Sequence, residues 1–255
     1  TGGIGRDYYG GFSRWTVKAG CVKQFCEPGN LFAAWKAVAG QDGVARILYP
    51  DPAPESIHGA PGLPGWRRDY PAAAASYHAL FPKAWYHYRA LPDMPVELIC
   101  EQFSPVLPGR YREASLPVGV FVWHARNTGD RPVSLSLLFS FTNMVGWFND
   151  FAAGRPLANR GGGLFNRPVN LPLEVPGQSL AGVLFDRRHA GAIPDEGDGQ
   201  MCIAARMEPG VTVTRHVGCQ VGYMPAGKDP WESFAAGGRL ADETPSHYCG
   251  SCADL

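Results

Sequence analysis

Glycine and proline are spread along the whole chain, and this placement is the strongest constraint on its fold. The sequence holds 32 Gly and 23 Pro among 255 residues, without confining them to one linker. Both residues interrupt regular structure and favour turns. Parallel α/β folds need helices of about ten or more residues between strands, and the intervening segments here mostly contain Gly and Pro. The pattern therefore predicts many short antiparallel strands joined by turns.

The clearest strand candidate covers residues 133–142. Its apolar residues occupy every second position from Val133 to Phe141, and Ser or Thr fills most positions between them. This period of two buries one face of a strand and exposes the other. A second candidate covers residues 117–126, and the turn-forming residues 127–132 separate the two. We therefore expect these two strands to form an antiparallel hairpin.

Other segments complete the predicted fold. Further strand candidates, each bounded by Gly, Pro, Asn or Asp, are residues 12–17, 32–38, 96–103, 179–185, 201–207 and 211–221. A helix is expected after Asp229, with Pro230 at its first position, Trp231 and Phe234 one turn apart, and glycines at its end. Residues 72–79 form a second helix candidate. We predict an all-β fold: one two-sheet antiparallel β-sandwich over residues 1–255, with one or two short helices.

Composition excludes several classes of function. Lys plus Arg and Asp plus Glu both number 23, so the formal net charge is zero and no overall positive field favours nucleic acid. No apolar run reaches the roughly 20 residues of a membrane-spanning helix. The seven cysteines are scattered and no Asn-x-Ser/Thr acceptor occurs, which favours a reducing, cytoplasmic location. We expect a soluble protein that is neither transmembrane nor bound to nucleic acid.

Candidate metal and cofactor ligands are poorly spaced. Cys249 and Cys252 alone have a metal or redox spacing, and a four-cysteine zinc site would need a second pair. His78 and His87 are nine residues apart and share no helical face. Loop cysteines and structural histidines are the simpler interpretation, so we expect no metal and no cofactor.

Two sequence blocks are long and compositionally unusual: YHALFPKAW at residues 77–85 and SPVLPGRYREASLPVGVFVW at residues 104–123. Shorter segments accompany them, namely GGIG at residues 2–5, SRW at 13–15, FTN at 141–143 and a W-x-x-F-x-x-G-x-x-L pattern from Trp231. In order and approximate spacing, these segments resemble the N-terminal, non-catalytic domain of glycoside hydrolase family 116. This is the group of non-lysosomal glucosylceramidases, or bile acid β-glucosidases. The resemblance spans nearly the whole chain.

The resemblance implies part of a retaining β-glucosidase that acts on glucosylceramide-like or other β-glucosides. In such an enzyme a β-sandwich precedes a helical domain, and that second domain carries the nucleophile and the acid/base carboxylate. We therefore expect no catalytic residue here, and we expect Glu101, Glu113, Asp150 and Asp186 to be solvated or to cap turns. The expected partners are the helical catalytic domain of the same polypeptide and its β-glucoside. Membrane association of a cytoplasmic full-length protein stays open.

One segment could face the substrate. Residues 143–151, NMVGWFNDF, follow the clearest strand and are rich in aromatic side chains. A Trp offers a flat apolar face to a sugar ring, and Asn or Asp beside it can bind hydroxyls. Asn143, Trp147 and Asp150 are therefore our substrate-entrance candidates. In the competing interpretation, Trp147 and Phe148 only pack against the helical domain.

Two functions remain open for the chain. As a support domain for a β-glucosidase, it should expose an apolar patch where the helical domain packs. As a stand-alone carbohydrate-binding module, it should have a polar surface and bind sugar by itself.

Overall fold

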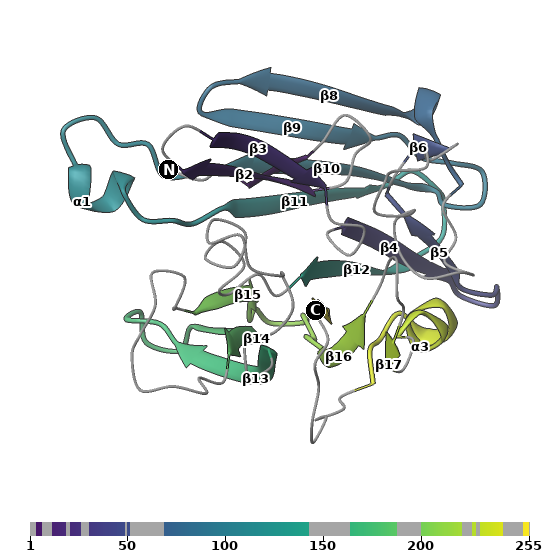
Figure 1. Ribbon diagram of the computed structural model, residues 1–255. Coiled ribbons are helices and arrows are strands. Elements are labelled where there is room, and N and C mark those ends of the chain that lie inside the picture. Colours follow the sequence, from purple (N-terminus) through teal and green to yellow (C-terminus); the bar gives the residue numbers. More distant parts are fainter. Residues whose placement is uncertain are drawn as a thin grey trace.

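Short strands dominate the fold (Figure 1). The computed structural model describes residues 31–48, 69–141, 166–186, 200–217 and 230–241 with their side chains. It describes the backbone alone for residues 4–6, 12–18, 21–26, 50–51, 142, 164–165, 187, 218–220, 226–227 and 252–254. Nearly all pairings within these ranges are antiparallel, and the helices are short. The predicted all-β sandwich is confirmed.

Two sheets form the main layers of the sandwich. The first has the order β11-β10-β9-β8 and is antiparallel throughout. Its strands are β8 (Ala75–Leu80), β9 (Lys83–Tyr88), β10 (Val96–Phe103) and β11 (Val120–Asn127). The second has the order β17-β16-β18-β12-β4-β5. Its strands are β4 (Leu31–Val38), β5 (Val44–Ile47), β12 (Val133–Thr142), β16 (His216–Gln220), β17 (Ala226–Gly227) and β18 (Cys252–Asp254).

Smaller sheets flank these layers. One contains β1 (Ile4–Arg6), β2 (Phe12–Lys18) and β3 (Cys21–Cys26), and another contains β13 (Leu164–Pro172), β14 (Ser179–Arg187) and β15 (Met201–Arg206). The strands β6 (Pro50–Asp51) and β7 (Tyr70–Pro71) form a short parallel pair. The β13–β15 sheet packs onto the second main sheet because Val183 and Phe185 share a buried cluster with Phe141 of β12 and Val217 of β16.

The core between the main sheets follows from the period of two. In β10, Val96, Leu98 and Cys100 are buried, whereas the residues between them are only partly covered. Phe32 of β4 reaches across to the first sheet, where its ring centroid lies 4.9 Å from that of Trp123. Within its own sheet, Phe32 lies 4.5 Å from Phe139 of β12. These aromatic contacts join the two layers.

Strand β4 is buried on both faces. Phe32 and Ala34 face the core between the sheets, whereas Leu31, Ala33 and Trp35 belong to a second cluster on the opposite face. Double burial explains why β4 is a nearly continuous apolar run without clear alternation.

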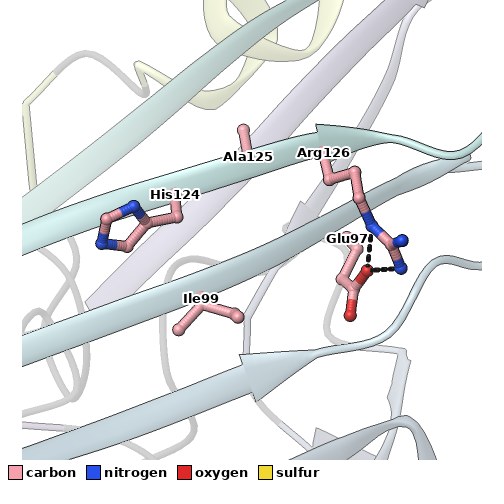
Figure 2. A pocket seen from close by; sticks show the side chains of 5 residues that line it. All are labelled: Glu97, Ile99, His124, Ala125 and Arg126. Carbon is pink, nitrogen blue, oxygen red and sulfur yellow. Dashed lines mark hydrogen bonds and ion pairs between the residues drawn. The ribbon is translucent and has the colours of Figure 1, made fainter.

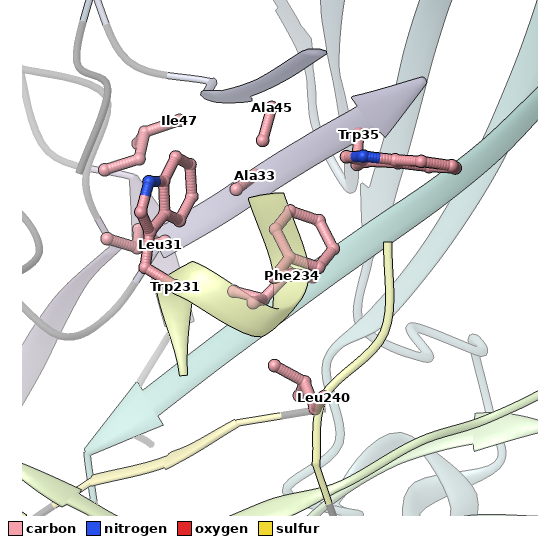
Figure 3. Close-up of a cluster of buried hydrophobic side chains, with 9 residues drawn as sticks. Leu31, Ala33, Trp35, Ala45, Ile47, Trp231, Phe234 and Leu240 are labelled. Carbon is pink, nitrogen blue, oxygen red and sulfur yellow. The ribbon is translucent and has the colours of Figure 1, made fainter. Parts of the chain in front are cut away.

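A C-terminal helix covers the second face of β4 (Figure 3). This helix, α3 (Trp231–Gly237), places Trp231 and Phe234 against the cluster that contains Leu31. The indole Nε1 of Trp35 donates a hydrogen bond of 3.0 Å to the carbonyl of Ala235. The helix ends at Gly238, whose φ of 66° is left-handed. The predicted helix is confirmed, but it begins one residue later than expected, because Pro230 is its N-cap residue and not its first helical residue. Asp229 lies outside the described residues.

The structure corrects the predicted hairpin of residues 117–126 and 133–142. Strand β11 pairs along its length with β10, whereas β12 pairs with β4 in the other sheet. In the turn between them, the amide of Gly129 donates to Oδ1 of Asn127 at 2.9 Å. This turn carries the chain from one sheet to the other. Both apolar faces are then buried against each other across the core instead of lying side by side.

The second predicted helix is also wrong. Residues 72–79 form a single 3₁₀ turn, η1 (Ala72–Ala74), followed by strand β8. Alanine favours helix, but pairing with β9 overrides this weak local preference. Another short helix, α1 (Tyr111–Ala114), lies in the connection between β10 and β11 and was not predicted.

Candidate functional site

The three substrate-entrance candidates lie just beyond the described part of β12. Asn143, Trp147 and Asp150 are outside the described residues, as is Phe148. Their proposed contact with substrate or with a neighbouring domain therefore stays a prediction.

The other carboxylates considered from the sequence are engaged by neighbouring side chains. Glu101 accepts from Lys83 Nζ at 2.5 Å, and Glu113 accepts from Arg110 Nη2 at 2.5 Å. Asp186 accepts a hydrogen bond of 2.7 Å from Gln200 Nε2. Each carboxylate is thus bound by a neighbouring side chain, which fits a structural role better than catalysis.

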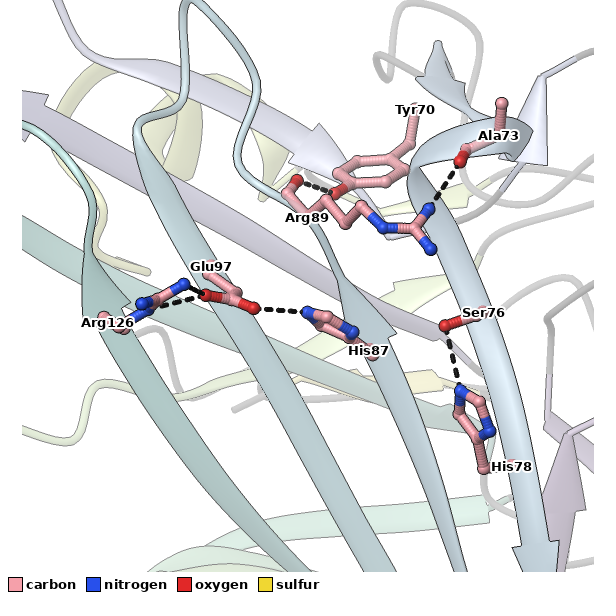
Figure 4. Close-up of polar contacts among 8 residues, drawn as sticks. All are labelled: Tyr70, Ala73, Ser76, His78, His87, Arg89, Glu97 and Arg126. Carbon is pink, nitrogen blue, oxygen red and sulfur yellow. Dashed lines mark hydrogen bonds and ion pairs between the residues drawn. The ribbon is translucent and has the colours of Figure 1, made fainter.

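A polar network crosses three strands on the outer face of the first sheet (Figure 4). Glu97 of β10 lies between Arg126 of β11 and His87 of β9. Nε of Arg126 donates to Glu97 Oε2 at 2.6 Å, and a second bond comes from Nη2 of the same guanidinium. His87 Nε2 lies 2.5 Å from Glu97 Oε1. Hydrogen bonding from Arg126, followed by that from His87, lowers the pKa of Glu97 below 4.5.

This network borders a shallow depression of about 300 Å³ (Figure 2). Its lining is Glu97, Ile99, His124, Ala125 and Arg126. Both carboxylate oxygens of Glu97 already accept hydrogen bonds, so Glu97 is a poor proton donor or nucleophile. The depression is better explained as the surface of a polar network that links three strands than as a catalytic site.

Two histidines of the first sheet, His78 and His87, have polar neighbours. His78 Nε2 lies 3.2 Å from the hydroxyl oxygen of Ser76, and His87 contacts Glu97 as described above. Among the residues with described side chains, no group of three or more His, Cys, Asp and Glu is placed to hold a metal ion.

Exposed apolar side chains gather at one end of the first sheet. The register Leu80↔Lys83↔Phe103↔Val120 places the β8–β9 turn and the β10–β11 connection at the same end. Figure 1 shows this hairpin end and α1 extending in the same direction. Phe81 is 86% exposed, Leu80 72% and Tyr111 82%. We call these three residues, together with Val106, Leu107, Leu116 and Val118, the apolar end surface.

The apolar end surface comes from the two unusual sequence blocks, residues 77–85 and 104–123. Sequence reasoning noted these blocks but did not foresee that they lie at the same end of one sheet. Their signal was an apolar composition interrupted by Pro and Gly, which keeps large side chains in turns where no strand pairing buries them.

The fold and this surface define an antiparallel β-sandwich with exposed apolar side chains at one end, as far as the described residues go. A family model described as beta-glucosidase 2, glycosyl-hydrolase family 116 N-term, matches residues 1–252. The chain belongs to this family of N-terminal domains, and the resemblance noted from its sequence is confirmed. Membership implies a companion catalytic domain. In the part of the chain that the structure describes, no helix is long and apolar enough to span a membrane.

Proposed function

We propose that this chain is the non-catalytic N-terminal β-sandwich of a retaining, glucosylceramidase-like β-glucosidase. It packs on the helical catalytic domain of the same polypeptide and shapes the entrance to its active site. The apolar end surface carries the proposal, because exposed apolar side chains as large as Phe81 and Tyr111 at one end of a sheet often mark a binding surface. The family match supplies the enzyme class.

The carboxylates support a non-catalytic role. Retaining glycosidases need two carboxyl groups about 5 Å apart, one ionised as nucleophile and one protonated as acid. Glu97, Glu101 and Glu113 each bind a neighbouring Arg or Lys side chain instead. Both catalytic carboxylates would then come from the helical domain.

An activity assay tests this proposal. The 255-residue chain and a longer polypeptide that includes the helical domain should be compared on an aryl β-glucoside and on glucosylceramide. Only the longer form should be active, with retention of the anomeric configuration. Hydrolysis by the short chain would overturn the proposal, and sugar binding by the short chain would favour a stand-alone carbohydrate-binding module.

The entrance residues are tested in the longer form. Trp147→Ala should raise KM more than it lowers kcat, whereas Trp147→Phe, which keeps an apolar ring, should change KM less. Asn143→Ala and Asp150→Ala should act in the same direction. If Trp147→Ala lowers only thermal stability, the aromatic segment packs against the helical domain without contacting substrate. Fractionation of cells that make the longer form tests the cytoplasmic location and the alternative of membrane association.

A further inference from the structure

We infer that the companion helical domain docks on the apolar end surface and along the outer edge of strand β8. This inference rests on the proposed function and adds the location and the chemistry of the contact. It concerns a different part of the chain from the entrance candidates.

The edge of β8 lacks the usual protection of an edge strand. In the described sheet β8 pairs only with β9, so one side of its backbone has no partner strand. Natural edge strands are commonly protected by Lys, Pro or bulges. The sequence of β8, ASYHAL, contains no Lys, Arg, Asp, Glu or Pro. Its residues Tyr77 and Leu80 are both exposed. The opposite edge strand, β11, contains a charged residue, Arg126, which is exposed.

The charges near this surface favour a protein partner over an anionic membrane. Lys83 pairs with Glu101 at 2.5 Å, and Arg110 pairs with Glu113 at the same distance. Within residues 77–85 and 104–118, Arg112 is the one further Lys or Arg. Binding to anionic lipid typically uses a cluster of about four to eight Lys or Arg. A surface with compensated charges and large apolar side chains instead matches the apolar face of a helix.

A second group of exposed apolar residues provides a control. Val175 is 53% exposed at the turn between β13 and β14, and Val211 is exposed near the end of β15. Both belong to the β13–β15 region and not to the sheet that carries Phe81. Substitutions there remove a comparable exposed apolar side chain without touching the proposed contact.

Hydroxyl-radical footprinting of the longer polypeptide tests the inference. Phe81 and Tyr111 should be oxidised slowly, at a rate close to that of Tyr70, which is 2% exposed within the domain. Oxidation as fast as in the urea-unfolded protein would overturn the inference. So would protection that appears only at high protein concentration, which indicates a second copy, or only with phosphatidylserine vesicles, which indicates a lipid surface.

Substitutions separate this inference from the proposed function. Phe81→Ser in the longer polypeptide should speed oxidation of Tyr111 by roughly tenfold or more, because truncating a central interface aromatic weakens binding by that order. Slow oxidation of Tyr70 confirms that the domain is still folded. Val175→Ser should leave Tyr111 protected. If Val175→Ser exposes Tyr111 and Phe81→Ser does not, the docking site lies elsewhere while the proposed function stands. Hydrolysis by the 255-residue chain alone would overturn the proposed function whatever the footprint.

Discussion

Replacing Phe234 with alanine tests whether helix α3 is an integral part of the core. Phe234 is 2% exposed and lies in the cluster formed with Leu31 and Trp35, and its ring centroid is 5.8 Å from that of Trp231. A buried aromatic side chain removes about 150–250 Å² from water. At about 25 cal/mol per Å², this burial corresponds to about 4–6 kcal/mol, part of which alanine retains. With the cavity included, we expect a loss of about 3–5 kcal/mol in the free energy of unfolding.

The measurement is urea unfolding of the 255-residue chain, followed by Trp fluorescence because Trp35 and Trp231 belong to the same cluster. Domains of this kind are stable by only about 5–15 kcal/mol, so the midpoint should fall clearly while the slope m stays constant. Phe81→Ala is the matched control. It makes the same chemical change at an exposed site and should cost no more than about 0.5 kcal/mol. Equal losses for the two variants, or a loss below about 1 kcal/mol for Phe234→Ala, would refute the reasoning.

Three further predictions concern backbone conformation and titration. Gly238→Ala should destabilise the domain by more than about 1 kcal/mol, because Gly238 is left-handed and a Cβ there would lie 2.4 Å from Cε3 of Trp35. Gly237→Ala, with no heavy atom within 4 Å of its Cβ, should be neutral or slightly stabilising in the same urea experiment. The lowered pKa of Glu97 means that its network stabilises the fold above pH 4.5 and that this contribution is lost as pH falls through the folded-state pKa. Arg126→Ala should therefore move the NMR titration midpoint of the Glu97 carboxyl upward, and an unchanged midpoint would show that the guanidinium is not its main partner. Burial raises the pKa of Tyr70 from 10.0 to about 12, so its contribution to stability is complete below pH 10 and is lost as pH rises through about 12. Tyr70→Phe should remove the last phenolate absorbance step of the folded protein, and persistence of that step would assign it to another tyrosine.

Local pattern was sufficient for several elements. The boundaries predicted for residues 96–103 are those of β10, because flanking turn residues such as Pro95 and Pro105 mark both ends of the strand. Helix α3 was predicted from its apolar spacing and its terminal glycines. The two unusual blocks were also enough to indicate the family, which the match over residues 1–252 confirms.

The local sequence pattern did not determine which strands pair with each other. The period of two says which side chains of β11 and β12 share a face, but it does not say which strand lies beside each one. Pairing of β11 with β10, and of β12 with β4, depends on contacts far apart in the chain. Long-range pairing also explains the wrong prediction for residues 72–79. The alanines indicated a helix, but pairing with β9 makes residues 75–80 a strand.

The sequence by itself determined that this chain is an antiparallel β-sandwich of the family 116 N-terminal type, because turn residues, alternation and local motifs act over a few neighbouring positions. Only the tertiary structure brought Phe81 and Tyr111 to one end of the first sheet, 30 positions apart in the sequence. Their placement at the same end depends on the register between β9, β10 and β11. Register is set by the burial of whole faces across the core, which no single segment specifies.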